Sequence, residues 1–231
     1  MISKISKIKN KDILLKAIIC FISYFFITDI ISLIFDNIFS FLNLKGIYYD
    51  IYNILKYLIY PILLFIVYKD ELLENLVRFK NKILEYLPNM ITPYFIGFIV
   101  MLISNIFIIY IFHLGQATNE QQLNELSKMY PIYVFVASCF VGPFIEEIVF
   151  RFCLRKIIRN DKLFIILSGL IFGLLHVLFS MNSIMDLLFV IPYGSLGCAF
   201  AYMYVKTDNI WSTVLVHTLH NTVLSLLKMV V

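Results

Sequence analysis

Apolar residues fill seven long stretches of the chain, and short polar segments separate them. The stretches cover about residues 13–35, 51–68, 93–113, 133–154, 163–181, 184–205 and 211–229. A helix needs about 20 mostly apolar residues to cross the hydrocarbon core of a membrane. The pattern therefore predicts an all-α, polytopic membrane helical bundle with about seven transmembrane helices, within a range of six to eight.

The number of membrane spans depends on how the first two stretches are interpreted. Asp29 lies inside the first, which could be broken there, and Pro61 could kink the second. Residues 70–87 place apolar side chains at helical spacing with charged residues between them, which predicts an amphipathic helix on the cytoplasmic surface. Residues 114–130 are polar, and we expect them to form an outer loop.

The basic residues assign a side of the membrane to each loop. One set of loops holds Lys4, Lys7, Lys9, Lys11, Lys69, Arg78, Lys80, Lys82, Arg155, Lys156, Arg159, Lys162 and Lys206. The alternate loops hold only Lys45, Lys128 and Lys228. Because cytoplasmic loops of membrane proteins are enriched in lysine and arginine, this alternation predicts a cytoplasmic N-terminus and, with seven spans, an outside C-terminus.

Composition agrees with a membrane protein. The chain has 231 residues, of which 61% are hydrophobic and 15% charged, so a soluble domain of this length would expose too much apolar surface. The net charge of +4 follows the alternate loops rather than one stripe, so we expect the lipid bilayer as a partner and no nucleic acid. The cysteines lack C-x-x-C spacing and are interpreted as small buried apolar residues. They are Cys20, Cys139, Cys153 and Cys198.

Ionisable and amide side chains lie inside the apolar stretches of the second half. They form the motifs Glu146-Glu147-x-x-x-Arg151, Phe172-x-x-x-His176 and His217-x-x-x-Asn221. An ionisable group in a membrane span typically costs a few kcal/mol on insertion scales, which is why such groups usually mark a functional site. The candidate catalytic residues are therefore Glu146, Glu147, Arg151, His176, His217 and Asn221.

Helical spacing suggests how the glutamates and the first histidine are placed. Glu147 and Arg151 are four residues apart and can pair, which leaves Glu146 as a candidate general base. The alternative is a buried ion network that only ties helices together. Glu146 lies 15 residues before Asp161 and His176 lies 15 residues after it. A helical hairpin turning there would bring the two to a similar depth.

The last motif supplies two candidate hydrogen-bond donors. His217 and Asn221 share a helix face and could stabilise an oxyanion. His220, next to Asn221, is interpreted as a supporting or structural residue.

A metal ion is an alternative way to activate water. Glu146, His176 and His217 are candidate ligands of a divalent metal such as zinc. No H-E-x-x-H motif occurs in the sequence. Metal-activated and glutamate-activated water both remain open, and no cofactor is assigned.

The ordered motifs resemble the CPBP family of intramembrane proteases, the CAAX protease and bacteriocin-processing or Abi family. They read Glu146-Glu147-Ile-Val-Phe-Arg151, Phe172-Gly-Leu-Leu-His176 and His217-Thr-Leu-His-Asn221, and the resemblance covers about residues 131–225. It implies that Glu146 and His176 activate the attacking water. It also implies that Glu147 and Arg151 orient the site, and that His217 and Asn221 bind the tetrahedral oxyanion.

The resemblance also implies how the chain is organised. Residues 1–130 would supply N-terminal membrane helices, and residues 131–229 a protease-like core, within one integrated membrane domain. The expected enzyme is a glutamic endopeptidase or a metalloendopeptidase of the cell membrane, with its active site facing the cytoplasmic side or the bilayer interior.

The expected substrate is a membrane-associated peptide or protein. The residue usage hints at an AT-rich bacterial genome, so a bacteriocin or pheromone precursor is the hypothesis, with a role in self-immunity. Two other classes stay open, a non-catalytic membrane immunity or receptor protein and a transporter. The sequence assigns no oligomeric state.

Overall fold

The computed structural model describes residues 2–42 and 44–230, which form helices joined by short turns, with no strand among them. In chain order the elements are α1 (Ile2–Ser23), α2 (Ile27–Phe39), η1 (Ser40–Leu42), α3 (Ile47–Val67), α4 (Lys69–Phe112), α5 (Thr118–Met129), α6 (Pro131–Val136), η2 (Ala137–Val141), α7 (Gly142–Glu147), η3 (Ile148–Cys153), α8 (Leu154–Ile157), α9 (Asp161–Leu178), η4 (Ile184–Phe189), α10 (Val190–Thr207) and α11 (Ile210–Val230). Elements η1 and η4 are 3-10 turns, whereas η2 and η3 are π-helical.

Several of these elements can cross a membrane. Within the described residues, six helices are long and apolar enough, and the bent pair Lys11–Ser23 and Ile27–Phe39 makes a seventh span when counted as one. The pair is bent by 53°, at a break just before the position of Asp29. The prediction of an all-α, polytopic membrane bundle is therefore confirmed.

The two polar segments differ in how they compare with their predictions. Residues 70–87 are helical as predicted, and they continue into the third predicted span, because α4 runs without a break for 44 residues. Residues 114–130 are not a loop, since α5 takes up twelve of them. A helix as long as α4 extends about 66 Å, roughly twice the hydrocarbon thickness, so it cannot lie wholly along one membrane normal.

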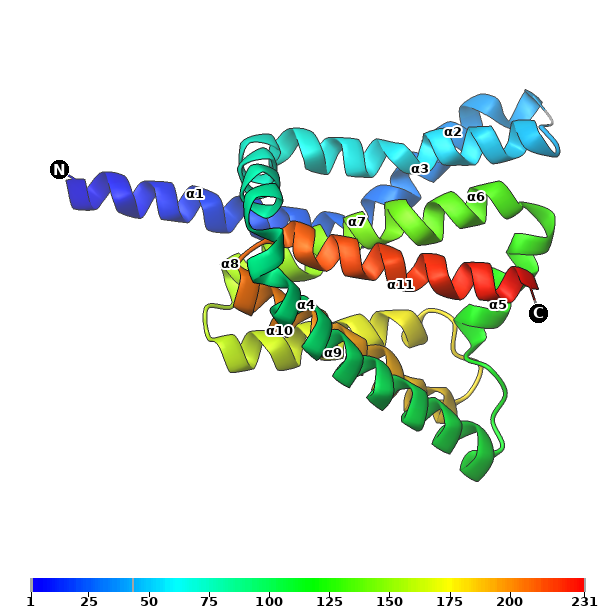
Figure 1. Cartoon of the computed structure of the whole chain (residues 1–231). Coiled ribbons are helices and arrows are strands. Elements are labelled where there is room, and N and C mark those ends of the chain that lie inside the picture. The colour runs from blue at the N-terminus through cyan, green and yellow to red at the C-terminus, as the bar shows by residue number, and fades with distance from the viewer. Residues whose placement is uncertain (1, 43, 231) are drawn as a thin grey trace.

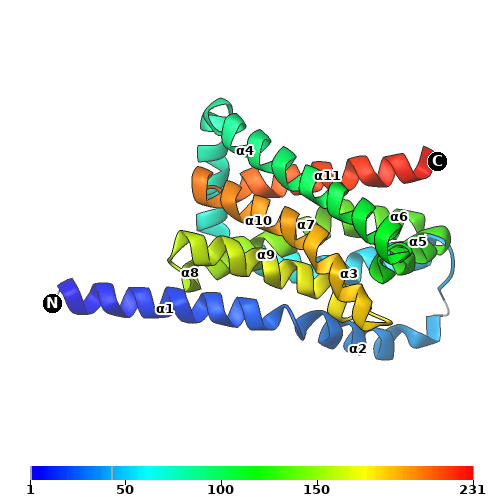
Figure 2. The same ribbon diagram turned by 90° about the horizontal axis from the view of Figure 1, so that it is seen from below.

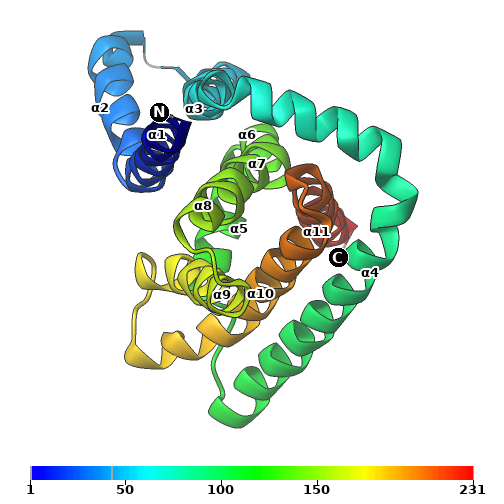
Figure 3. The same ribbon diagram turned by 90° about the vertical axis from the view of Figure 1, so that its left-hand side faces the viewer.

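Helix α4 instead bends into two arms, as Figure 3 shows. Pro88 and Pro93 lie inside the helix, where each proline removes a backbone donor and favours a kink. The first arm crosses one end of the bundle, and the second arm runs beside α10 and α11 (Figures 2 and 3). The first arm thus lies at one end of the bundle, and its place on the cytoplasmic surface of the membrane stays a prediction.

Polar contacts fix the first arm to the turn between α10 and α11. The Asn209 side chain donates to the carbonyl of Asn75 at 2.8 Å, and the Trp211 indole donates to the carbonyl of Leu72 at 2.9 Å. Arg78 pairs with Asp208 at 3.1 Å. Because these contacts hold the first residues of α11, they also fix the rotation of that helix about its axis.

Loops and turns gather at two ends of the bundle, as Figure 1 shows. The start of α4, the turn from α8 to α9 and the turn from α10 to α11 lie at one end, together with the start of α1. Helix α5, the turn from α2 to α3 and the end of α11 lie at the other. Helix α10 packs between α9 and the second arm of α4.

The four cysteines are unbonded thiols, and Cys20, Cys139 and Cys153 are buried as interpreted from the sequence, whereas Cys198 is half-buried. Cys20 of α1 and Cys153 of η3 are buried with their sulfur atoms 3.1 Å apart, beside the Tyr68 hydroxyl. They pack α1 against the helix that carries the glutamates.

Glycines let the backbones of α9 and α10 touch. A Cβ on Gly169 would lie 2.2 Å from the sulfur of Cys198, and one on Gly173 would lie 2.6 Å from the carbonyl oxygen of Val190. Small residues commonly permit such close approach between membrane helices. This approach sets the relative position of the side chains that α9 and α10 contribute to the interior.

Gly173→Ala is expected to force α9 and α10 apart and to destabilise the fold by about 1–3 kcal/mol, the usual range for overpacking. Gly115→Ala is the matched control, because its Cβ would meet its nearest atom at an ordinary 3.7 Å. Thermal unfolding in detergent should show a lower melting temperature for Gly173→Ala alone. Equal melting temperatures for the two variants would contradict the close contact.

Candidate active site

The helix that carries the two glutamates departs from α geometry on both sides of them. The π-helical segments η2 and η3 flank α7, and Pro143 stands in the first turn of α7. Inserted π turns change the rotation of the residues that follow them and occur often at functional sites. The α-helical geometry is therefore interrupted by a widened turn just before Gly142 and Pro143, and by another just after the glutamates.

Glu147 lies at the centre of a buried polar network. Its Oε1 is 3.2 Å from Nη1 of Arg151 and 2.8 Å from Nδ1 of His217, and neither the Glu147 nor the Arg151 side chain is exposed. Arg151 also donates from Nη2 to the carbonyl of Gly197 at 3.1 Å. The predicted pairing of Glu147 with Arg151 is thus confirmed, and His217 joins it from α11.

The network fixes the tautomer of His217. A carboxylate can only accept a hydrogen bond, so Nδ1 of His217 carries the hydrogen that Glu147 accepts. The other ring nitrogen, Nε2, is directed towards Glu146 and lies 3.8 Å from its Oε2. An oriented imidazole beside a second carboxylate is a common arrangement for proton transfer.

Two phenylalanines enclose the arginine and this histidine. The Arg151 guanidinium lies 4.6 Å from the ring centre of Phe172 and 5.5 Å from that of Phe200. The Phe200 ring also stacks on His217, with centroids 4.8 Å apart. Cation–π contacts are strongest where water is excluded, so the rings help to keep the charge of Arg151 inside the bundle.

His176 has different partners from those expected for it. Its Nδ1 bonds to the carbonyl of Phe172 at 2.8 Å, which leaves Nε2 as the nitrogen without the hydrogen. Its ring stacks on Tyr193 of α10 at 4.7 Å, and the Tyr193 hydroxyl donates to Asn119 of α5 at 3.0 Å. Tyr193 was not identified from the sequence as a residue of the site, although a tyrosine next to Pro192 in an apolar stretch is a polar group that could have been noted.

Asn221 and His220 point to different neighbours. The Asn221 amide donates one hydrogen to the carbonyl of Ser138 at 2.8 Å and keeps its second for another acceptor. His220 packs against Tyr94 and Phe98 of α4, with the Tyr94 hydroxyl 3.2 Å from its Nδ1. This contact agrees with the structural interpretation of His220.

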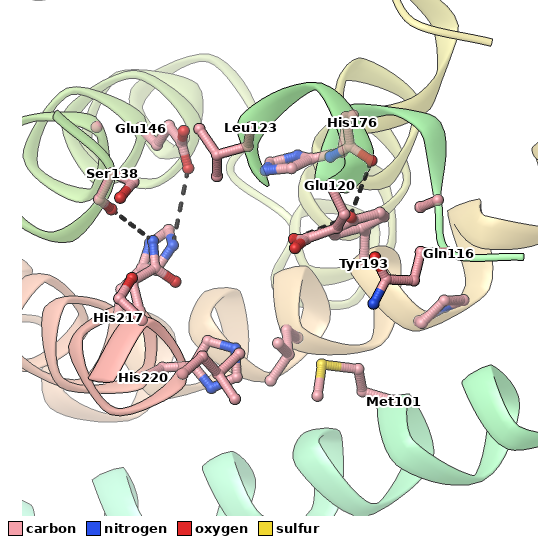
Figure 4. A pocket seen from close by; sticks show the side chains of 18 of the residues that line it. Met101, Gln116, Glu120, Leu123, Ser138, Glu146, His176, Tyr193, His217 and His220 are labelled. Carbon is pink, nitrogen blue, oxygen red and sulfur yellow. Dashed lines mark hydrogen bonds and ion pairs between the residues drawn. The ribbon is translucent and has the colours of Figure 1, made fainter. Parts of the chain in front are cut away.

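A cavity of about 540 Å³ joins most of the candidate residues. Four of the six line it: Glu146, His176, His217 and Asn221. Glu147 and Arg151 lie behind its wall. In Figure 4, Glu146 and His217 occupy one side and His176 and Tyr193 the other, with Leu123 of α5 between them. The predicted pair Glu146 and His176 therefore share the cavity, but the side chain beside Glu146 is His217.

The candidate metal ligands do not form a ligand set. Within the described part of the chain, no group of three or more histidine, cysteine, aspartate or glutamate side chains could hold a metal ion. His217 and His176 each keep Nε2 available, but only His217 lies beside Glu146. A catalytic zinc site needs three protein ligands around one point, so these residues do not fit one.

A comparison with known families matches the part of the chain that carries the candidate residues. The family model described as type II CAAX prenyl endopeptidase Rce1-like matches residues 128–223, which contain all six candidate residues. The match confirms the resemblance that the three motifs indicate. No solved structure matches this chain.

Three bacterial proteins are similar in sequence. The "Putative membrane peptidase YdiL" of Bacillus subtilis (strain 168) is 28% identical over 124 residues, 52% of this chain and 47% of that protein. UPF0177 protein YvdC of Lactococcus lactis subsp. lactis (strain IL1403) is 30% identical over 141 residues, 59% of this chain and 52% of its own length. UPF0177 protein YaiF of the same strain is 29% identical over 226 residues, 93% of this chain and 98% of its own length. The alignments thus span about half the length of the first two relatives.

The two glutamates should differ in what they do for stability. Glu147→Gln removes the charge that compensates the buried Arg151, and breaking such a pair typically costs about 3–5 kcal/mol. Glu146→Gln is the matched control, because the Glu146 side chain is 19% exposed and its carboxylate lies beside His217 rather than beside an arginine. Thermal unfolding in detergent should show a clear loss for Glu147→Gln and little change for Glu146→Gln.

A double variant separates lost charge balance from lost packing. Adding Arg151→Met to Glu147→Gln removes the uncompensated charge and should recover part of the stability. Equal destabilisation by the two single variants, or no recovery in the double variant, would contradict the role given to the pair.

Proposed function

We propose that this multi-pass membrane protein is an intramembrane endopeptidase whose catalytic core is formed by residues 128–223, the part that matches a CAAX-type endopeptidase family. The observation that carries the proposal is the difference between two neighbouring carboxylates. Glu147 is engaged by Arg151 and His217, whereas Glu146 lies on the cavity wall without an arginine. Two carboxylates in contrasting surroundings are a recurrent way to separate a supporting group from a proton-transferring one.

Glu146 is the proposed general base. A water molecule within hydrogen-bond reach of Glu146 Oε2 and His217 Nε2 would lie on the cavity wall, since these atoms are 3.8 Å apart. Glu146 takes a proton from this water, and the water oxygen attacks the carbonyl carbon of the scissile peptide bond. Glu147 holds His217 in the orientation that this step needs.

The remaining steps use groups that line the same cavity. The free amide hydrogen of Asn221 would stabilise the oxyanion of the tetrahedral intermediate. His217 would do so only with a second hydrogen on Nε2, because its Nδ1 hydrogen is donated to Glu147. Glu146 then returns its proton to the leaving nitrogen as the carbon–nitrogen bond breaks, giving a carboxylic acid and an amine. His176 faces the cavity with an unprotonated Nε2 and would accept a hydrogen bond from the water or the amine.

The proposed substrate is a membrane-associated peptide or protein. The cavity walls combine polar and apolar side chains, and the apolar ones, among them Met101, Leu196 and Phe200, suit apolar side chains near the cleaved bond. Processing of a bacteriocin or pheromone precursor, or self-immunity through such cleavage, is the biological hypothesis that follows.

Glu146→Gln should abolish cleavage without unfolding the protein. Positioned general bases contribute about 10²–10⁴-fold to rate, so at least this factor should be lost. The measurement is cleavage of a membrane-peptide library by the purified protein in detergent, followed by mass spectrometry. Glu85→Gln is the control, since Glu85 is an exposed carboxylate paired with Lys82.

A chelator distinguishes the two ways of activating water. The proposal expects cleavage to persist in the chelator and to be lost in Glu146→Gln. Loss of cleavage on chelation with recovery on added zinc would contradict it. Peptide binding without cleavage, unchanged in Glu146→Gln, would instead favour a non-catalytic immunity or receptor protein.

A further inference from the structure

The cavity occupies only one half of the bundle. Its lining runs from Glu146 and His217 at mid-bundle to Glu120 of α5 and Lys228 near the end of α11. Within the described chain, no lining residue comes from residues 58–100, 147–171 or 201–216, which build the opposite half. The cavity therefore extends from the candidate site towards the end that carries α5 (Figures 1 and 4).

The opposite half of the bundle is closely packed next to the candidate site. Glu147, Arg151 and Ile148 are fully buried, as are Phe164 of α9 and Ile210 of α11. The first arm of α4 lies across this end and is fixed to the turn between α10 and α11. We call this the closed end, and the end that carries α5 the open end.

The two ends differ in the number of lysine and arginine residues that they hold, and both ends contain ion pairs. The closed end holds most of the loop cations with described side chains, among them Lys69, Arg78, Lys80, Lys82, Arg155, Lys156, Arg159, Lys162 and Lys206. The side chains of Lys4, Lys7 and Lys9 lie outside the described part of the structure. At the open end Lys228 pairs with Glu120, and Lys128 pairs with Glu125 at 2.7 Å. By the positive-inside rule, the closed end faces the cytoplasm.

We propose that the cavity is entered from the extracytoplasmic side, beneath α5, by an extended apolar peptide segment held at the outer surface of the membrane. This access differs from the expectation from the sequence, in which the active site faces the cytoplasmic side or the bilayer interior. The direction of access rests on the cavity and the charges alone, and only the fate of the peptide rests on the proposed function.

The rim and the walls suit such a segment. Gln116, Asn119 and Glu120 line the rim and carry amide or carboxylate groups that can bond to an extended backbone. The space of about 540 Å³ is that of a typical ligand pocket, so it admits a few residues and not a folded domain. Leu123 of α5 lies among the cavity side chains and is the apolar group that a peptide would meet on its way to Glu146 (Figure 4).

Thiol accessibility tests the direction without using activity. Gln122→Cys is exposed on α5, Leu123→Cys faces the cavity, and Lys206→Cys is exposed at the closed end. The background has the four native cysteines replaced by alanine. In intact cells, a membrane-impermeant maleimide should label the first two before permeabilisation, and Lys206→Cys only afterwards.

The labelling pattern decides the proposal. Labelling of Lys206→Cys alone in intact cells would overturn the orientation. Labelling of Gln122→Cys without any labelling of Leu123→Cys, before or after permeabilisation, would overturn the opening beneath α5.

A blocking variant links access to cleavage. Leu123→Trp should strongly reduce cleavage of the peptide library, while the outward neighbour Gln122→Trp should leave it unchanged. Full cleavage by Leu123→Trp would overturn entry beneath α5. Absence of cleavage in the wild-type protein would count against the proposed function, and the labelling pattern would still decide the access.

Discussion

The buried pair of Glu147 and Arg151 is the constraint on which the interior depends. Neither side chain is exposed, so each charge persists only because the other and their hydrogen-bond partners are in place. Those partners are His217 of α11 and the carbonyl of Gly197 in α10. Three helices must therefore meet at one point, and their meeting directs Nε2 of His217 into the cavity.

Adjacent residues on one helix take different roles because successive side chains point about 100° apart. Glu147 is directed into the packed half of the bundle and Glu146 onto the cavity wall. The π-helical segments η2 and η3 on either side set the local rotation that makes this division possible. The same short helix thus supplies a charge that holds the fold together and a carboxylate that lines the cavity.

Polar segments outside the spans complete the arrangement, and their form was the least predictable part of the fold. Helix α5 has a mostly polar sequence with few apolar residues, and short polar helices are marginal by themselves. Helix α5 is held by contacts with Lys228 and Tyr193, which are distant in the sequence, so the local sequence pattern did not predict this helix. The sequence also did not predict that α4 is continuous. Prolines usually mark the end of a helix, and Pro88 and Pro93 lie at the bend of α4.

The sequence by itself determined the helical spans, the six candidate residues and the pairing of Glu147 with Arg151, because apolar runs and i,i+4 neighbours are local properties. Only the tertiary structure decided that Glu147 binds His217, 70 residues away, that His176 stacks on Tyr193, and that the cavity opens towards α5. These features depend on the rotation and contact of helices that are apolar on most faces. Hydrophobicity can place such a helix in the membrane, but packing between glycines and buried polar groups sets which side chains meet.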